Sequence, residues 1–252
     1  MPGVFYLEVN AGLCNRLRAL VSGICWAQEL GRKLVVCWPS QKPECAAGFY
    51  DLFGEGSLPD DVSVMDGILS RVNTCLSSTD AEKFIQAVPA DEPISIKSHG
   101  CFWGGDRQIW LQHLRALKPS DTVRARLDEY RRKGCGNLDM AIHIRRTDNE
   151  KAIRLSPLSA FITQIRDLPS PQRFILFSDD PQAVHLLIEE FGVAKFICPE
   201  VLRARHTREG MIEASAVFFS LSSCRMIYGS ANSSFSEIAR DHGDANLVIV
   251  RD

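Results

Sequence analysis

At residues 141–148 the chain reads Ala141-Ile142-His143-Ile144-Arg145-Arg146-Thr147-Asp148. An apolar run suited to a buried strand is followed at once by two arginines and then by an aspartate. Ligands of α/β sheets bind at the carboxyl ends of the strands. Arginine stays charged and offers a planar fork of donors, so paired arginines at a strand end favour a phosphate or diphosphate ligand.

A plainer interpretation of the same residues is an edge strand whose Arg and Asp side chains pair with one another in water. His143 lies two residues before Arg145 and therefore shares a face of the strand with it. On this segment alone the two interpretations are equally good. Two further segments of the sequence favour the interpretation as a phosphate-binding site.

Strands and helices alternate on both sides of this segment. Residues 4–9 and 33–38 are expected to be strands, with a helix between them that Gly31 ends. A strand–helix–strand unit predicts a parallel sheet with a right-handed crossover. Weaker patterns predict strands at 62–65 and 94–97, and helices from Thr79 or Asp80 to Val88, through 109–114, and from Pro119-Ser120-Asp121 to about Gly134.

The second half alternates more regularly. Strands are expected at 139–145, 174–177, 195–198, 225–228 and 247–250, with helices at 157–168, 181–191, 209–222 and 234–242. This order predicts a doubly wound α/β fold. We place the boundary between an N-terminal α/β half, 1–135, and a C-terminal Rossmann-like half, 136–252.

The composition excludes some classes of protein. The 252 residues carry a formal charge of −2, which argues against a nucleic-acid partner. Basic residues gather locally instead, at 145–146 and at Arg203, Arg205, His206 and Arg208. We find no leader and no integral membrane segment, and therefore expect a cytoplasmic protein.

The nine cysteines include no Cys-x-x-Cys pair. Several lie in apolar runs, namely Cys25, Cys37, Cys198 and Cys224. This pattern favours buried, reduced thiols over a disulfide framework or a zinc site.

The segment Gly12-Leu13-Cys14-Asn15-Arg16-Leu17-Arg18 forms a strand-to-helix turn. The amides at such a turn are unpaired, and Asn15 and Arg18 add donors. A tight turn with Asn15 as helix cap and Arg18 in solvent explains the segment equally well. With a single glycine, it is neither a dinucleotide fingerprint nor a P-loop.

Two more strand ends in the second half are polar. In Ser178-Asp179-Asp180-Pro181, one carboxylate is expected to cap the next helix and the other to accept hydrogen bonds from a base or sugar. In the segment 230–237, Ser234 and Glu237 have capping-box spacing. Asn232 and Ser233 are left unexplained by capping. Hydroxyls and free amides at a helix start predict a phosphate cradle complementary to Arg145.

Some kinds of site are missing from the sequence. No Asp-x-Asp occurs, so a diphosphate held through a divalent metal lacks its usual carboxylate pair. No Gly-x-Ser-x-Gly elbow is present for a serine hydrolase. Five histidines show no metal-ligand spacing: His99, His113, His185, His206 and His242. We therefore expect no metal and no cofactor.

The motifs together resemble those of the fucosyltransferase superfamily that includes the α1,2-, α1,6- and protein O-fucosyltransferases. The resemblance rests on residues 12–17, on the His-x-Arg-Arg-x-Asp element at 143–148, on Ser178-Asp179-Asp180 and on Ser230-Ala231-Asn232-Ser233-Ser234-Phe235-Ser236. Residues 40–118 contribute nothing to it.

This resemblance implies a GT-B-like fold with two Rossmann-like halves facing across a cleft. It implies an inverting, metal-independent transfer of fucose from GDP-fucose to a glycan or other hydroxyl acceptor. Arg145 would contact the β-phosphate and stabilise the departing GDP. The residues expected to bind the donor are Gly12, Asn15, Arg18, His143, Arg145, Asp179, Asp180, Asn232, Ser233, Ser234 and Phe235.

Some members of this superfamily carry an acidic residue, in or just after the first glycine loop or beyond the Arg-Arg element, that acts as the catalytic base. In the glycine loop this chain departs from that pattern. Ala11 and Cys14 stand there in this chain, so Asp148 and Glu150 are the nearest candidates. GDP itself could instead receive the proton. Three rival functions stay open: transfer from another nucleotide sugar, nucleotide-sugar binding without catalysis, and an α/β scaffold whose polar strand ends bind a protein.

Overall fold

The computed structural model describes residues 3–75, 77–169, 172–201 and 204–252. The chain forms two compact units. Unit 1 comprises Met1–Val123 and Ala204–Ser215, and unit 2 comprises Arg124–Arg203 and Ala216–Asp252. The boundary predicted from the sequence lies between residues 135 and 136. Helix α5 (Asp121–Arg132) instead belongs mostly to unit 2, where Tyr130 packs on Phe177 with ring centroids 5.9 Å apart.

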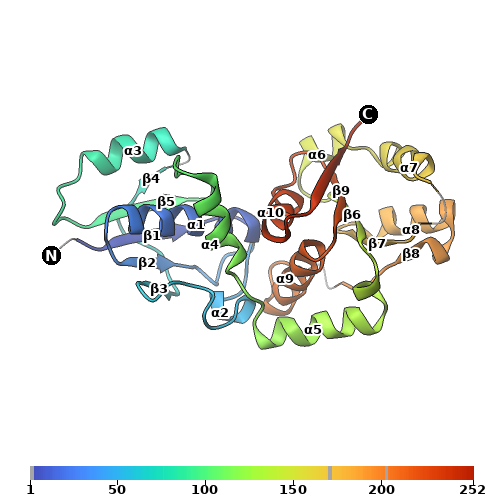
Figure 1. The fold of residues 1–252 in the computed structure, drawn as a ribbon, viewed down its shortest axis with the longest axis horizontal. Helices are drawn as coiled ribbons and strands as arrows, with labels where there is room; N and C mark the ends of the chain where they lie inside the picture. Colours follow the sequence, from blue (N-terminus) through green and yellow to red (C-terminus); the bar gives the residue numbers. More distant parts are fainter. Residues whose placement is uncertain (1–2, 76, 170–171, 202–203) are drawn as a thin grey trace. The chain divides into compact units, whose positions relative to one another are not determined.

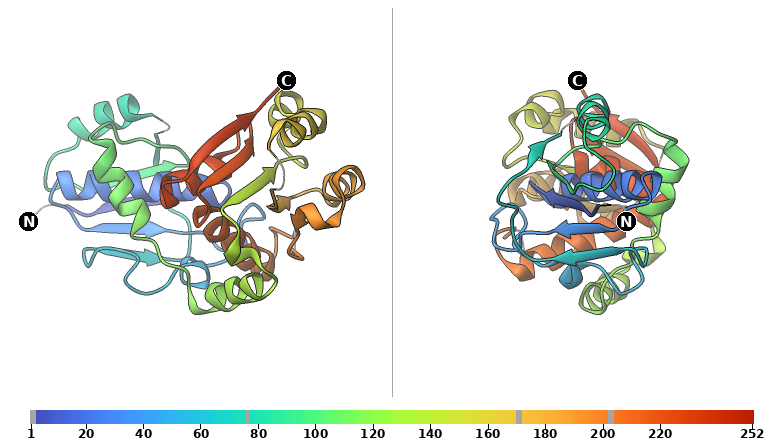
Figure 2. Two further views of the ribbon diagram at one scale, coloured as in Figure 1. Left: turned by 45° about the vertical axis from the view of Figure 1, so that its right-hand side comes forward. Right: turned by 90° about the vertical axis from the view of Figure 1, so that its left-hand side faces the viewer.

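Unit 1 contains a five-stranded sheet in the order β3-β2-β1-β5-β4, and every neighbouring pair is parallel. Its strands are β1 (Phe5–Val9), β2 (Leu34–Cys37), β3 (Val62–Met65), β4 (Asn73–Thr74) and β5 (Ile94–Ser98). Figure 2 shows these strands side by side, with α1 packed on the sheet. The apolar strands β1 and β2 lie inside the sheet, which matches their nearly continuous burial.

The helices of unit 1 are α1 (Leu13–Glu29), α2 (Phe49–Leu52), α3 (Ser78–Gln86) and α4 (Arg107–Arg115). Gly23 lets α1 approach β1, because a Cβ at residue 23 would lie 2.5 Å from Leu7 Cδ2. Gly31, with φ of 61°, ends the α1 turn in the left-handed conformation that glycine favours.

Unit 2 contains a second parallel sheet, in the order β10-β9-β6-β7-β8 (Figure 1). Its strands are β6 (Met140–Ile144), β7 (Phe174–Ser178), β8 (Phe196–Ile197), β9 (Met226–Ser230) and β10 (Asn246–Val250). The helices of unit 2 are α6 (Glu150–Leu155), α7 (Leu158–Asp167), α8 (Pro181–Phe191) and α10 (Ser234–Gly243). Helix α9 (Arg208–Ser222) begins in unit 1 and ends in unit 2. Short 3-10 turns lie at Cys135–Asn137 and Val193–Lys195. The core includes Ile142, Phe161, Phe174 and Leu187.

The expected α/β fold with two Rossmann-like halves is confirmed. Each strand predicted in the second half is present within two residues of its expected ends. Three short elements were missed: α2, β4 and α6. The predicted cap of α3 was wrong, because Ser77, rather than Thr79 or Asp80, accepts the capping hydrogen bond, from Asp80 N at 3.2 Å.

The nine cysteines, all within the described residues, form no disulfide, and seven of them are buried. Burial raises the pKa of Cys25 and Cys224 to about 12. Cys198 is half-buried, so the prediction of a buried thiol was wrong at this position. Within the described residues, no helix has the length and apolar character needed to span a bilayer.

Candidate functional site at the strand-order reversal of unit 2

The chain order of the unit 2 sheet reverses between β6 and β9. From β6 the chain continues outward to β7 and β8, and it then returns to the other side of β6 to form β9 and β10. Parallel α/β sheets bind ligands outside the carboxyl ends of the strands at such a reversal. Here those ends are Ile144 and Ser230. The edge-strand interpretation of β6 was wrong, because β6 is the central strand.

Hydrogen bonds join the segments that follow β6 and β9. The Arg145 amide donates to Ser230 Oγ over 3.0 Å. Asn149 Nδ2 donates to the Asn232 carbonyl oxygen, also over 3.0 Å. The arginine segment and the serine-rich loop, which are about 85 residues apart in the chain, therefore lie at one edge of the sheet.

The Arg145 guanidinium is held by two carboxylates. Its Nη1 lies 3.0 Å from Asp179 Oδ2, and its Nη2 pairs with Asp148 Oδ1. Asp179 also accepts hydrogen bonds from Arg146 N at 2.7 Å and from Thr147 Oγ1 at 2.7 Å. The Arg145 side chain is 19% exposed, so its charge is oriented by the protein and still reaches solvent.

Arg146 carries an unsatisfied donor. Its Nη1 is buried and has no hydrogen-bond partner among the described residues. A buried donor without a partner is costly, and such groups are rare in folded proteins. Arg146 was not among the residues predicted to bind the donor, although its position beside Arg145 was a usable signal.

Helix α10 begins at Ser234, with Ser233 at the N-cap. The Ser233 side chain makes no capping hydrogen bond. The predicted capping box of Ser234 and Glu237 was therefore wrong by one residue, because Ser234 is already helical. Asn232 precedes the cap in the left-handed conformation, with φ of 53°. The positive end of α10, uncapped by Ser233, suits an anion.

His143 lies beneath this helix start and is buried. Its Nδ1 is 2.8 Å from Ser236 Oγ, and its ring stacks on Phe235 with centroids 5.1 Å apart. Burial lowers the pKa of His143 to about 4; the nearby Asp179 raises this pKa and Arg145 lowers it. The imidazole is thus neutral at pH 7 and acts as a packing and hydrogen-bonding support for α10.

The other acidic residues predicted for this site differ in their contacts. Asp180 is the N-cap of α8 and accepts from Gln182 N at 2.9 Å, which confirms that one of the two aspartates caps this helix. Glu150 is the first residue of α6 and is exposed. Its carboxylate has no hydrogen bond or ion pair with another described residue.

The predicted residues of the first half lie at the start of α1 in unit 1. Gly12 is the N-cap, without a side-chain hydrogen bond, and Asn15 and Arg18 are in the first two turns. Arg16, which the sequence analysis did not select, is fully buried. Arg16 Nε donates to the Ala11 carbonyl oxygen over 2.9 Å and therefore fixes the turn before α1. Its Nη2 is buried without a partner in the described part of the chain.

The described residues contain no group of three or more His, Cys, Asp or Glu side chains arranged to hold a metal ion. The positive charges near the Ile144 and Ser230 strand ends come instead from arginine side chains and a helix start. This arrangement can bind an anionic group and can stabilise negative charge that develops on it.

Solved structures of fucosyltransferases share this fold. NodZ alpha-1,6-fucosyltransferase co-crystallized with GDP matches with a TM-score of 0.68 and 19% identity, covering 95% of this chain and 92% of that one. The structure of NodZ from Bradyrhizobium matches with a TM-score of 0.68 and 18% identity, covering 95% and 93%. POFUT1 in complex with GDP-fucose matches with a TM-score of 0.64 and 10% identity, covering 99% of each chain. No protein-family model and no curated protein matches the sequence.

Proposed function

We propose that this protein is a glycosyltransferase that transfers fucose from GDP-fucose to a hydroxyl group of a glycan or other acceptor. The observation that carries the proposal is the hydrogen bond from the Arg145 amide to Ser230 Oγ, which places Arg145 beside the loop that leads into α10, where the strand order of unit 2 reverses. The fold is similar to that of fucosyltransferases solved with GDP and GDP-fucose, which supports this donor.

In the proposed complex, the diphosphate of GDP lies between the Arg145 guanidinium and the first amides of α10. The buried Arg146 Nη1 is a further donor in this segment. Asp148 gives up its pairing with Arg145 when the phosphate binds, whereas Asp179 continues to hold the arginine segment through its amide and hydroxyl contacts.

The proposed reaction inverts the anomeric carbon. The bond from fucose C1 to the β-phosphate oxygen breaks, and the acceptor oxygen forms a bond to C1 from the opposite face. The electron pair of the broken bond stays on GDP, where Arg145 and the α10 dipole stabilise it. The acceptor proton passes to a carboxylate or to the departing GDP. Of the two candidate bases, Glu150 forms no ion pair or hydrogen bond with another described residue, whereas Asp148 pairs with Arg145.

We also propose that the reaction needs no divalent metal, because the guanidinium charge takes the place that a cation occupies in metal-dependent transferases. The test is to measure GDP binding by calorimetry and fucose transfer to an acceptor panel, with and without EDTA. We expect GDP to bind more tightly than UDP or ADP, and transfer to persist in EDTA. Tighter binding of another nucleotide identifies a different donor, and GDP binding without turnover identifies a binding protein.

A further inference from the structure

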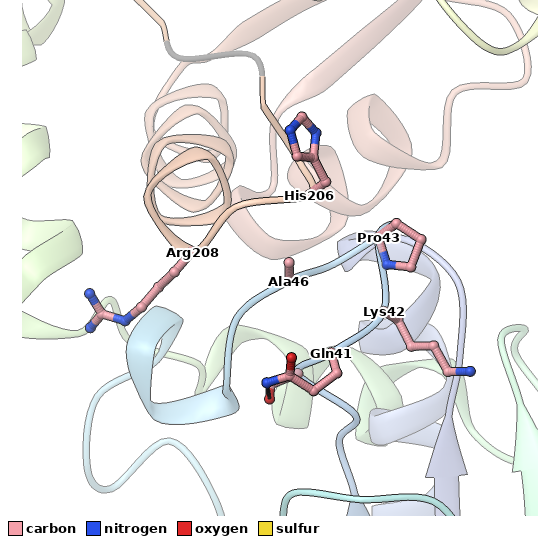
Figure 3. A pocket seen from close by; sticks show the side chains of 7 residues that line it. Gln41, Lys42, Pro43, Ala46, His206 and Arg208 are labelled. Carbon is pink, nitrogen blue, oxygen red and sulfur yellow. Dashed lines mark hydrogen bonds between the residues drawn. The ribbon is translucent and has the colours of Figure 1, made fainter.

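Unit 1 contains a pocket between the loop that follows β2 and the segment that precedes α9. Its volume is about 310 Å³, and it is lined by Ser40, Gln41, Lys42, Pro43, Ala46, His206 and Arg208. Three of these residues are basic and none is acidic. Figure 3 shows the loop residues along one wall and His206 on the other. We call this the β2-loop pocket.

Hydrogen bonds fix both walls of the β2-loop pocket. Arg16 Nη1 donates to the Pro39 carbonyl oxygen over 2.9 Å, and Trp38 Nε1 donates to that of Ala47 over 3.0 Å. Ala46 N donates to the Arg205 carbonyl oxygen over 3.2 Å, which joins the two walls. A ligand therefore meets a preformed surface, so little binding energy is lost in ordering the loop.

Arg208 serves mainly to hold the wall. Its Nη2 and Nε lie 2.7 and 2.8 Å from Asp51 Oδ1. In Figure 3 its side chain extends away from Gln41, toward α2. Asp51 also accepts from Gly48 N at 2.8 Å. The Asp51 carboxylate is therefore occupied by Arg208 and the Gly48 amide, and it does not pair with Lys42.

The other two basic residues of the pocket, Lys42 and His206, have no carboxylate partner in the described part of the chain. Asp66 is bound to Ser40, through the Ser40 amide at 2.9 Å and its hydroxyl. Lys42 and His206 make no ion pair with any described residue. Arg16 beneath the loop is fully buried, and this burial lowers its pKa. The nearby carboxylates Glu44 and Asp66 act in the opposite direction and raise it. Lys42 therefore gives the pocket a positive charge that no ion pair with a described residue neutralises, whereas Glu44 and Asp66 partly compensate the charge of Arg16.

We propose that the β2-loop pocket binds a carboxylate or sulfate group on the acceptor saccharide; this inference rests on the proposed function. Lys42 would provide the ammonium, and its flexible stem can reach an anion at the mouth of the pocket. His206, Ser40 and Gln41 would provide hydrogen bonds to the anion or to neighbouring sugar hydroxyls. The acceptor would thus be an anionic glycan, selected over its neutral counterpart by this charge.

The test is a ligand-observed NMR titration of the whole chain with glucuronate, glucose 6-sulfate and glucose, in which inorganic sulfate is measured as a competitor of the charged sugars. We expect one or both charged sugars to bind, and the better of them to bind at least about tenfold more tightly than glucose and than inorganic sulfate. Lys42→Gln should weaken that binding about fivefold, and His206→Gln about threefold. Lys83→Gln, an exposed lysine on α3 that does not line the pocket, is the matched control and should change nothing.

Three results would overturn the proposal: no binding of either charged sugar, equal binding of glucose, or equal losses in the Lys42 and Lys83 variants. Inorganic sulfate that binds as tightly as the sugars would also overturn it, because the site would then recognise only an ion. GDP affinity is measured on the same samples. If the unmodified chain does not bind GDP, the proposed function is contradicted. If it binds GDP but neither charged sugar, only the proposal that the β2-loop pocket binds an anionic saccharide is contradicted.

Discussion

Ala11 and Asn232 occupy corresponding positions in the two units. Each lies two residues after a strand that borders the strand-order reversal of its own sheet, and two residues before a helix. Their φ angles are 64° and 53°, in the left-handed region that residues other than glycine rarely adopt. In each case the next residue is the helix N-cap: Gly12, which has no side chain, and Ser233, whose side chain makes no capping hydrogen bond. The same strand-to-helix turn therefore precedes α1 and α10.

The conformation of Asn232 gives a first prediction. Asn232→Val should lower the free energy of unfolding by about 1–2 kcal/mol, because a β-branched residue is poorly accommodated at this φ. Asn232→Gly should have little effect. Urea unfolding measures both. Asn246→Val, at an exposed position on β10, is the matched control, and an equal loss there would show that the backbone of Asn232 is not the cause.

The proposed role of Arg145 gives a second prediction. Arg145→Ala should reduce fucose transfer by about 10²–10³-fold, because a positioned donor to the departing diphosphate is lost. Arg145→Lys should also be strongly impaired, because an ammonium cannot reproduce the planar fork. Steady-state transfer rates and GDP affinities measure the effect.

The control for Arg145 is Arg166→Lys on α7, where the guanidinium pairs with Glu190 at the surface. This variant should transfer fucose at the normal rate. Near-normal transfer by either Arg145 variant would refute the assignment of Arg145 to the diphosphate.

The buried imidazole of His143 predicts a dependence of stability on pH. Its pKa of about 4 in the folded protein lies below the ordinary value of 6.5, so below pH 6.5 the unfolded chain binds the proton first. The stabilisation from His143 is complete above pH 6.5 and is lost as the pH falls toward 4, by roughly 2–3 kcal/mol. Urea unfolding at pH 7.0, 5.5 and 4.5 measures this loss.

A non-titrating side chain at residue 143 separates this contribution from that of the carboxylates. In His143→Gln, the loss of stability between pH 6.5 and 4.5 should be smaller than in the unmodified chain. His185→Gln replaces an exposed histidine that pairs with Glu189 and should leave the pH dependence as it is. The same pH dependence in all three proteins would contradict the buried, neutral state of His143.

Close packing at Gly229 provides a fourth prediction. A Cβ at this position in β9 would lie 2.7 Å from Ser236 Oγ and 2.9 Å from Ser236 Cβ. Gly229→Ala should therefore displace the start of α10, at a cost of about 1–3 kcal/mol, and weaken GDP binding. Ser236→Gly removes both clashing atoms, so the double variant should be more stable than the sum of the two single losses predicts. Strict additivity would show that Ser236 is not the obstacle.

The sequence predicted the parts of the fold that depend on long apolar runs. The strands β6, β7 and β9 and the helix α8 were found because buried strands and amphipathic helices impose a period on the sequence. The helix α2 has four residues and α6 has six, too few for a helical period to appear. The ends of these short helices are set by contacts within the folded units. At α2, for example, the Gly48 amide donates a hydrogen bond to the Asp51 carboxylate.

The candidate site was predicted in part for the same reason. Parallel strands end at a common edge, so the placement of Arg145 near Ser230 followed from the alternation of strands and helices. The role of Asp179 as an anchor for Arg146 and Thr147, and the burial of His143 against Phe235, depend on side-chain packing that no local pattern encodes. The unsatisfied Arg146 Nη1 likewise appears only when burial is known.

A crystal structure of the protein with GDP is the most direct test of the diphosphate site in unit 2. We predict that the β-phosphate lies within hydrogen-bonding distance of the Arg145 guanidinium and of the amides at residues 233–234. In that structure Asp148 should be released from Arg145. A diphosphate bound elsewhere, or GDP absent at saturating concentration with the Arg145–Asp148 pair intact, would contradict the account.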